Sequence, residues 1–324
     1  MGEMGEMGEM GEMGEMGEMG EMGEMGEMGE MGEMGEHVSV IIPTMCDKAR
    51  GALLRRAIAS VRAQRGVRLE VIVVVNGQRF EPDIVDELQA RPELRVLQLD
   101  EGNVSAARLH GLRHASGAFF AFLDDDDEFL DGALARRVGL FRPGIDVVVS
   151  AGLVRRGGHD TPLVPASIAA TVNADIAGSF LRCNWFASPA SMFRAGAVRA
   201  DLFDMRLQYF EWTYLFFRLL AEGMRMHFDD TPTYRVHADT PASASKSAAY
   251  AAFSLVLFRD HILPLDLPAT VKRALRKKRV TALNVVSQHE LQAGRRLSAW
   301  RAHIECVLRG GVQFLPYTRH LLLR

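Results

Sequence analysis

The chain has 324 residues, of which 48% are hydrophobic and 24% are charged, a composition typical of a globular protein. Its three cysteines are widely spaced and odd in number, which argues against a disulfide framework and against a zinc site. No apolar run approaches the ~18 residues of a membrane-spanning helix, and no signal peptide is visible, so we expect a cytoplasmic protein.

Residues 1–36 repeat the triplet Met-Gly-Glu without interruption. A glycine in a helix costs about 1 kcal/mol relative to alanine, and the lack of proline argues against a collagen-like triple helix. We therefore expect a disordered tail, with Met34 as a candidate for the true start. The tail has 12 of the 41 acidic residues and none of the 38 basic ones, so the rest of the chain carries a formal net charge of +9.

Apolar runs alternate with helical patterns between residues 37 and 140. Strands are expected at residues 38–43, 69–75, 95–99 and 119–123. Helices are expected between them, at residues 52–64, 82–88 and 105–115, the last with Ser105 as a possible N-cap. This alternation predicts an α/β fold with a mostly parallel, Rossmann-like sheet and crossover helices.

Residues 141–265 are less regular, with strands expected at 145–150 and 189–193 and a helix at 213–221. Residues 266–324 are expected to form a helical C-terminal extension. From Val271 onward this extension has twelve lysines and arginines against only Glu290 and Glu305. Such a basic segment suits contact with an anionic membrane or a polyanionic acceptor. It is equally typical of a solvated helical face.

Four consecutive carboxylates, Asp124 to Asp127, follow the apolar run 118–123. Like charges this close repel one another, and a divalent cation would neutralise them. Mg²⁺ is usually held by one or two carboxylates together with substrate phosphates. Ligands of open α/β sheets bind at the carboxyl ends of the strands, which is where these residues are expected. The alternative is a solvated acidic turn that caps the next helix.

Several other nucleotide-binding classes are disfavoured. A dehydrogenase needs a Gly-x-Gly-x-x-Gly turn after its first strand, but residues 43–47 read Pro-Thr-Met-Cys-Asp. A P-loop is also absent, and Arg50-Gly51 is a poor substitute for the basic glycine-rich loop of a nucleotidyltransferase. A role with nucleic acid would rest on the basic C-terminus alone, and we expect none.

The order of motifs from about residue 38 to residue 245 resembles the family 2 glycosyltransferases, which have the GT-A fold. Residues 38–44 resemble the opening strand of that family, and residues 101–108 resemble the helix before its metal-binding motif. Residues 122–127, Phe-Leu-Asp-Asp-Asp-Asp, match the Asp-x-Asp motif itself. Residues 202–218 and 234–245 resemble the acceptor-side segment and the segment that follows it. The resemblance divides residues 37–265 into a nucleotide-sugar half (37–140) and an acceptor half (141–265).

The resemblance implies a set of donor-side residues. Asp126 would bind Mg²⁺ or Mn²⁺ directly, and Asp124 would face the ribose or a metal-bound water. Asp125 and Asp127 have structural or solvated roles as alternatives, although Asp125 is also a candidate donor contact. The remaining candidate donor contacts are Pro43 and Thr44 at the base pocket, Asn76 in place of the usual Asp, and Arg108 near the pyrophosphate. Asn76 is alternatively a turn residue, and Arg108 is alternatively a surface arginine.

The acceptor side departs from the family pattern. Family members transfer sugar with inversion, and their base is usually the Asp of a Glu-Asp pair, but here the pair reads Glu211-Trp212. We expect Glu211 to be the general base, with helix capping as its alternative role. Trp212 is a candidate for stacking on an acceptor sugar. His237 is a candidate ligand of the metal or diphosphate, or a structural histidine.

These inferences predict a metal-dependent inverting glycosyltransferase. The expected donor is a UDP- or dTDP-sugar, and the expected acceptor is a glycan or a lipid-linked saccharide used in cell-surface polysaccharide synthesis. The expected location is the cytoplasm, with peripheral contact at the inner membrane face. Because Trp212 occupies a possible base position, the alternative is a protein that keeps the GT-A fold and binds nucleotide-sugar or glycan without catalysing transfer.

Overall fold

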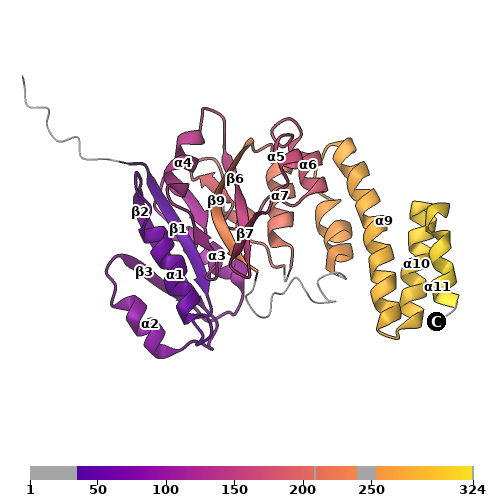
Figure 1. The fold of residues 1–324 in the computed structure, drawn as a ribbon, viewed down its shortest axis with the longest axis horizontal. Helices are drawn as coiled ribbons and strands as arrows, with labels where there is room; N and C mark the ends of the chain where they lie inside the picture. Colours follow the sequence, from indigo (N-terminus) through magenta and orange to yellow (C-terminus); the bar gives the residue numbers. More distant parts are fainter. Residues whose placement is uncertain (1–34, 208, 239–252, 323–324) are drawn as a thin grey trace, which may run out of the picture. The chain divides into compact units, whose positions relative to one another are not determined.

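The structure, a computed structural model, describes residues 35–207, 209–238 and 253–322. The repeated triplets up to residue 34 lie outside the described residues. A nine-stranded mixed sheet dominates this part of the chain, in the order β3-β2-β1-β4-β8-β6-β9-β5, with β7 paired to β6 (Figure 1). The predicted α/β class is therefore confirmed.

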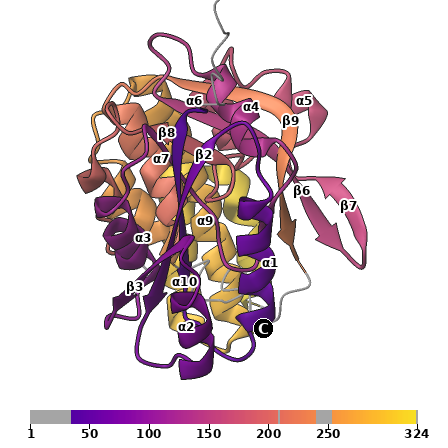
Figure 2. The ribbon, with the colours of Figure 1, turned by 90° about the vertical axis from the view of Figure 1, so that its left-hand side faces the viewer.

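The N-terminal part of the sheet is parallel. It consists of β1 (His37–Thr44), β2 (Arg68–Asn76), β3 (Leu94–Leu99) and β4 (Phe119–Phe122). The connecting helices are α1 (Gly51–Arg62), α2 (Pro82–Gln89) and α3 (Val104–Arg113). Figure 2 shows α1 and α3 on opposite faces of these strands. This arrangement follows from the strand order, because the chain passes from β1 outward to β3 and then returns to β4.

The second part of the sheet mixes directions. β8 (Ser191–Arg194) is antiparallel to both β4 and β6 (Val147–Arg156), and β9 (Met226–His237) runs parallel to β6. β5 (Glu128–Phe129) pairs antiparallel with β9, and β7 (His159–Pro162) forms a hairpin with β6. The helical segments here are α4 (Ala133–Leu140), α5 (Ala166–Ala169), α6 (Ile176–Arg182), η1 (Ala200–Phe203) and α7 (Glu211–Ala221).

The C-terminal residues are helical, as predicted. They form η3 (Leu257–Ile262), α9 (Ala269–Gln292), α10 (Arg296–Gly310), η4 (Val312–Tyr317) and α11 (Thr318–Leu322). Val271 and Leu275 of α9 belong to the main hydrophobic core, whereas Val280, Leu283 and Cys306 form a small core of their own between α9 and α10. Within the described residues, no helix is both long enough and apolar enough to span a membrane.

Two local predictions need correction. Helix α3 is capped by Asn103 rather than Ser105, because the Asn103 side chain accepts a hydrogen bond from the backbone N–H of Ala106 at 3.0 Å. The fourth strand ends at Phe122 rather than at Leu123, and the acidic residues lie in the turn beyond it.

Candidate active site

The carboxyl ends of β2, β1 and β4 lie side by side, as their order in the sheet requires. Thr44 ends β1 and Asn76 ends β2, and both side chains are buried. The Asn76 amide donates a hydrogen bond to the Thr44 carbonyl at 2.9 Å. Pro43, also buried, pairs in register with Val74 of β2. The predicted base-pocket residues are thus adjacent at one edge of the sheet.

The acidic residues beyond β4 form a turn that the Asp127 N–H closes by donating to the Asp124 carbonyl at 3.1 Å. Burial alternates along the turn: Asp125 and Asp127 are buried, whereas Asp124 and Asp126 are partly exposed. Two of the four carboxylates are therefore partly accessible to solvent and two are buried in the protein.

Asp125 is the main anchor. The Thr44 hydroxyl donates to its Oδ2 at 2.7 Å, and Arg50 forms an ion pair with its Oδ1. Burial raises the pKa of Asp125 to about 6, although Arg50 and Thr44 oppose that shift. Both carboxylate oxygens are engaged within the protein, which matches the structural role predicted as one alternative for Asp125.

Asp124 and Asp126 are the two carboxylates of the turn that are accessible to a cation. Burial and the neighbouring charge of Asp124 raise the pKa of Asp126, so the ionised pair is under repulsion. Carboxylate oxygens are the hard ligands that Mg²⁺ and Mn²⁺ prefer. Among the described residues no three His, Cys, Asp or Glu side chains are grouped to hold a metal ion by themselves. A metal here would need further oxygens from a bound ligand.

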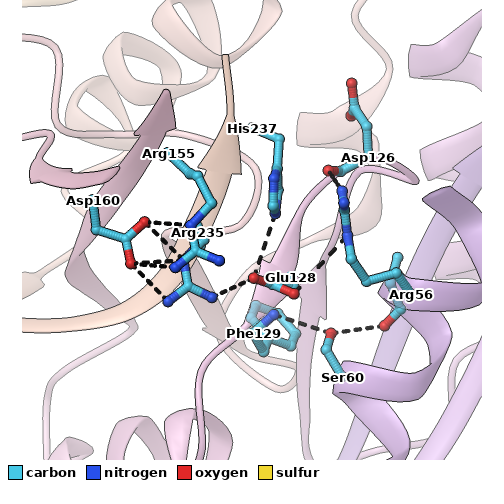
Figure 3. Close-up of polar contacts among 10 residues, drawn as sticks. Arg56, Ser60, Asp126, Glu128, Phe129, Arg155, Asp160, Arg235 and His237 are labelled. Carbon is cyan, nitrogen blue, oxygen red and sulfur yellow. Dashed lines mark hydrogen bonds and ion pairs between the residues drawn. The ribbon is translucent and has the colours of Figure 1, made fainter. Parts of the chain in front are cut away.

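The turn is braced by a polar network around Glu128 (Figure 3). Glu128 forms an ion pair with Arg235, and its Oε1 lies 3.4 Å from His237 Nε2. Arg56 of α1 donates to the Asp126 carbonyl at 2.6 Å and lies 3.9 Å from Glu128. Burial and the charge of Arg56 lower the pKa of His237, which favours its neutral form. The structure thus places His237 and Arg56 beside the same carboxylate, Glu128.

Arg108 joins the acidic turn to helix α7. Its guanidinium, almost wholly buried, donates to Asp124 Oδ1 at 2.6 Å and to Glu211 Oε1 at 3.2 Å. Burial opposes the positive charge, but the two carboxylates outweigh it and raise the pKa of Arg108. Ser188 also donates to Asp124 Oδ1, at 3.2 Å. The alternative role of Arg108 as a surface arginine is therefore wrong.

Glu211 is the first residue of α7, and Trp212 follows it into an aromatic cluster. The indole packs against Phe122, Phe186 and Phe193, with ring centroids 5.7 to 6.5 Å apart, and Arg108 lies 5.4 Å from its centre. Its Nε1 is buried and has no hydrogen-bond partner among the described residues. These contacts give Trp212 a supporting role beneath Arg108. Stacking on an acceptor sugar stays a prediction.

Comparison with known proteins identifies the fold and the family. The sequence model of the family described as glycosyl transferase family 2 matches residues 39–198. This range includes most of β1, the acidic turn and Ser188. Residues 39–198, just under half of the chain, belong to this family. The solved structure of S. aureus TarS 1–349 in complex with UDP-GlcNAc matches 88% of this chain and 88% of its own, with a TM-score of 0.58 at 17% identity. The fold is thus the GT-A fold, as the sequence predicted.

Two curated relatives share parts of the sequence. A GalNAc(5)-diNAcBac-PP-undecaprenol beta-1,3-glucosyltransferase of Campylobacter jejuni is 33% identical over 126 residues, which cover 38% of this chain and 40% of that protein. The putative glycosyltransferase EpsH of Bacillus subtilis is 24% identical over 228 residues, covering 64% of this chain and 57% of EpsH. The chain therefore spans about half the length of these relatives.

Three supporting residues were not predicted from the sequence. Arg50 pairs with Asp125, Arg56 holds the Asp126 carbonyl, and Ser188 donates to Asp124. Arg50 immediately precedes α1 and Arg56 lies within it. Basic residues just after the first strand, in a chain with an acidic motif after its fourth strand, are a sequence signal for such ion pairs. Ser188 precedes β8 in a segment with no motif, and nothing in the sequence alone singles it out.

Proposed function

We propose that the chain is a metal-dependent inverting glycosyltransferase that uses a nucleotide-diphosphate sugar, with UDP- or dTDP-sugars as the first candidates. The observation that carries the proposal is the contact of Arg108 with both Asp124 and Glu211. This contact links the Asp-x-Asp motif of a donor site to a carboxylate at the start of the acceptor-side helix. Donor and acceptor functions would then meet at one place in the fold.

On the donor side, the edge formed by Pro43, Thr44 and Asn76 would receive the nucleobase. An asparagine side chain both donates and accepts, so Asn76 suits the imide of uracil or thymine. Asp124 and Asp126 would hold Mg²⁺ or Mn²⁺, with His237 as a further candidate ligand. When bound, such an ion supplies Lewis-acid stabilisation of the negative charge that develops on the diphosphate.

On the acceptor side, Glu211 would accept the proton of the attacking hydroxyl. An ionised carboxylate is required for this task, and Glu211 Oε1 lies 3.2 Å from the Arg108 guanidinium. Inversion requires attack from the face opposite the leaving group, so the base must lie on the acceptor side. Glu211 is the first residue of α7, the helix that we propose faces the acceptor.

The acceptor proposed from the sequence is a glycan or a lipid-linked saccharide in cell-surface polysaccharide synthesis. A curated relative is named for action on an undecaprenol-linked glycan, which supports this class of acceptor. The rival proposal, a protein that binds donor without catalysing transfer, rests on the replacement of the usual catalytic Asp by Trp212.

A screen of nucleotide sugars, read as nucleotide release with Mg²⁺, Mn²⁺ or EDTA, tests the proposal. We expect release from at least one UDP- or dTDP-sugar in the presence of a saccharide acceptor, and none with EDTA. Calorimetric binding of a donor without release under any condition would favour the non-catalytic alternative. Neither binding nor release across the panel would contradict both.

A further inference from the structure

A cavity of about 710 Å³ lies in the C-terminal extension, between α9, the end of α10 and η4. It is remote in sequence from the residues of the proposed active site. Its volume falls within the range typical of small-molecule sites, roughly 300–1,000 Å³. Five cationic side chains from two helices line it: Arg273, Arg276, Lys277, Arg279 and Arg309.

The charge of this cavity is only partly balanced. Glu305 accepts hydrogen bonds from Arg279 at 2.6 Å and from Arg309 at 2.8 Å, so one carboxylate serves two arginines. Within the described part of the chain, the other three bases form no ion pair. Like charges converging on one hollow repel one another, and an anion relieves that repulsion. Arginine side chains match the geometry of phosphate oxygens in particular.

The shape of the cavity depends on two glycines. A Cβ atom on Gly310 would lie 2.3 Å from Val280 Cγ1, so only glycine permits this close approach of α10 to α9. Gly311 follows with φ of +84°, a left-handed conformation that turns the chain into η4. Phe314 of η4 then lines the cavity together with Val280. The cavity is thus lined by both cationic and apolar side chains.

An exposed apolar face adjoins this cavity. Leu297, Ile304 and Leu308 of α10 are spaced by seven and four residues, which places them on one side of the helix. Leu297 and Leu308 are 89% and 81% exposed, and Val312 of η4 is 78% exposed. The segment η4 connects the two features, because Gln313 and Phe314 line the cavity between Val312 and the exposed Leu315.

We propose that the C-terminal extension docks on an anionic lipid surface, with a lipid phosphate entering the Arg273–Arg276–Lys277 cavity and the apolar face entering the headgroup boundary. A soluble phosphate compound would neutralise the bases but would leave the apolar face in water. A lipid surface accommodates both, because interfacial helices combine buried apolar area with attraction between bases and anionic lipids. This inference does not depend on the catalytic proposal.

Flotation of the full chain with vesicles of phosphatidylcholine containing phosphatidylglycerol tests the docking, with no nucleotide sugar present. Each base near such a surface contributes about fivefold in affinity, so Arg273→Gln/Arg276→Gln/Lys277→Gln should lose about 100-fold. The matched control is Arg62→Gln/Arg65→Gln/Arg68→Gln, which removes three exposed bases outside the extension and should bind nearly as well as wild type. Thermal melts of both triple variants should match the wild type, because all six side chains are exposed.

A second pair of measurements separates the lipid from a soluble ligand. Leu297→Ser/Leu308→Ser should weaken vesicle binding, and calorimetry with glycerol 1-phosphate alone should detect weak binding at most. Wild-type binding by the cavity variant, or equal losses in that variant and its control, would overturn the cavity as the site. Tight binding of glycerol 1-phosphate with no binding of vesicles would overturn the lipid assignment in favour of a soluble phosphate ligand.

Discussion

Arg108 is the residue on which the site depends most. A buried charge is costly unless it is paired, and Arg108 is paired twice, with carboxylates 16 and 103 residues away along the chain. Removing one partner would leave excess charge in a buried position, so each carboxylate constrains the other through the guanidinium. The metal-motif residue and the candidate base are thereby held in fixed relation before any ligand binds.

Replacement of the candidate base gives the first prediction at this scale. Glu211→Gln removes the proton acceptor but preserves shape and a hydrogen bond to Arg108. A positioned general base contributes about 10²- to 10⁴-fold, so turnover should fall by that factor while donor affinity stays within about twofold. The control is Glu222→Gln, at the exposed C-terminal end of the same helix. Steady-state kinetics that leave turnover near wild type would eliminate Glu211 as the base.

Asp126, one of the two partly exposed carboxylates of the acidic turn, gives the second prediction. Asp126→Asn removes one negative charge from a pair under mutual repulsion, so the fold should be unaffected. Metal-dependent nucleotide binding should be lost, because a neutral amide is a much poorer ligand for Mg²⁺ or Mn²⁺. Asp131→Asn, an exposed carboxylate five residues further on, should bind as wild type does. Titration calorimetry with and without EDTA decides: unchanged affinity in Asp126→Asn excludes this residue from the metal site.

At the scale of elements, close packing of α3 on the sheet leads to a stability prediction. A Cβ atom on Gly111 would lie 2.5 Å from Ile41 Cγ2 and 2.9 Å from Val74 Cγ2, both in the buried core. Gly111→Ala should therefore destabilise the protein by about 1–3 kcal/mol through overpacking. This exceeds the gain in helix propensity, which is at most about 1 kcal/mol.

Gly139 of α4 offers a matched control, because a Cβ atom there would have no neighbour within 4 Å. Gly139→Ala should stabilise by about 0.5–1 kcal/mol through propensity alone. Urea denaturation compares the two. A midpoint for Gly111→Ala at or above that of the wild type would show that α3 can move away from β1 without cost.

The parallel half of the sheet could be predicted from the sequence because each element there has its own pattern. Continuous apolar runs mark β1, β2 and β4, and period-3.6 stripes mark α1 and α3. The twelve-residue strand β9 was missed, because Pro232 and the pair Asp229-Asp230 interrupt any strand pattern. In the structure the register shifts between Ser150 and Gly152 opposite this segment, and Gly152 leaves room for the Tyr234 ring. The register shift and the space at Gly152 accommodate the irregular sequence of β9. Both depend on pairing with β6, which is distant in the chain, so the local pattern does not reveal them.

The candidate site also combines residues that local sequence patterns predict with contacts that they do not. The Asp-x-Asp motif and Glu211 carry local signals, so both could be proposed from the chain alone. The convergence of Asp124 and Glu211 on one arginine depends on packing between α3 and α7, which no local pattern encodes. Burial also excluded the alternative that Arg108 is a surface arginine, and its surroundings are set by Trp212 and the aromatic residues beneath it.

At the scale of the whole molecule, the Met-Gly-Glu repeats distort the apparent charge. The formal charge of −3 for the full chain conceals a body that carries +9. From its sequence, a repeat in which two of every three residues are Gly or Glu is expected to contribute little to a folded core. A chain beginning at Met34 should therefore keep its melting temperature within about 1–2 °C and should keep its activity. Differential scanning calorimetry would contradict this expectation if removal of the repeats lowered the melting temperature clearly.

The stereochemistry of transfer tests the central claim most directly. Once the screen has identified a donor and an acceptor, proton NMR of the freshly formed product reports the configuration at its anomeric carbon. A single displacement assisted by Glu211 predicts inversion, so an α-linked nucleotide sugar should give a β-linked product. A product that retains the α configuration would contradict the roles given to Glu211 and the acidic turn.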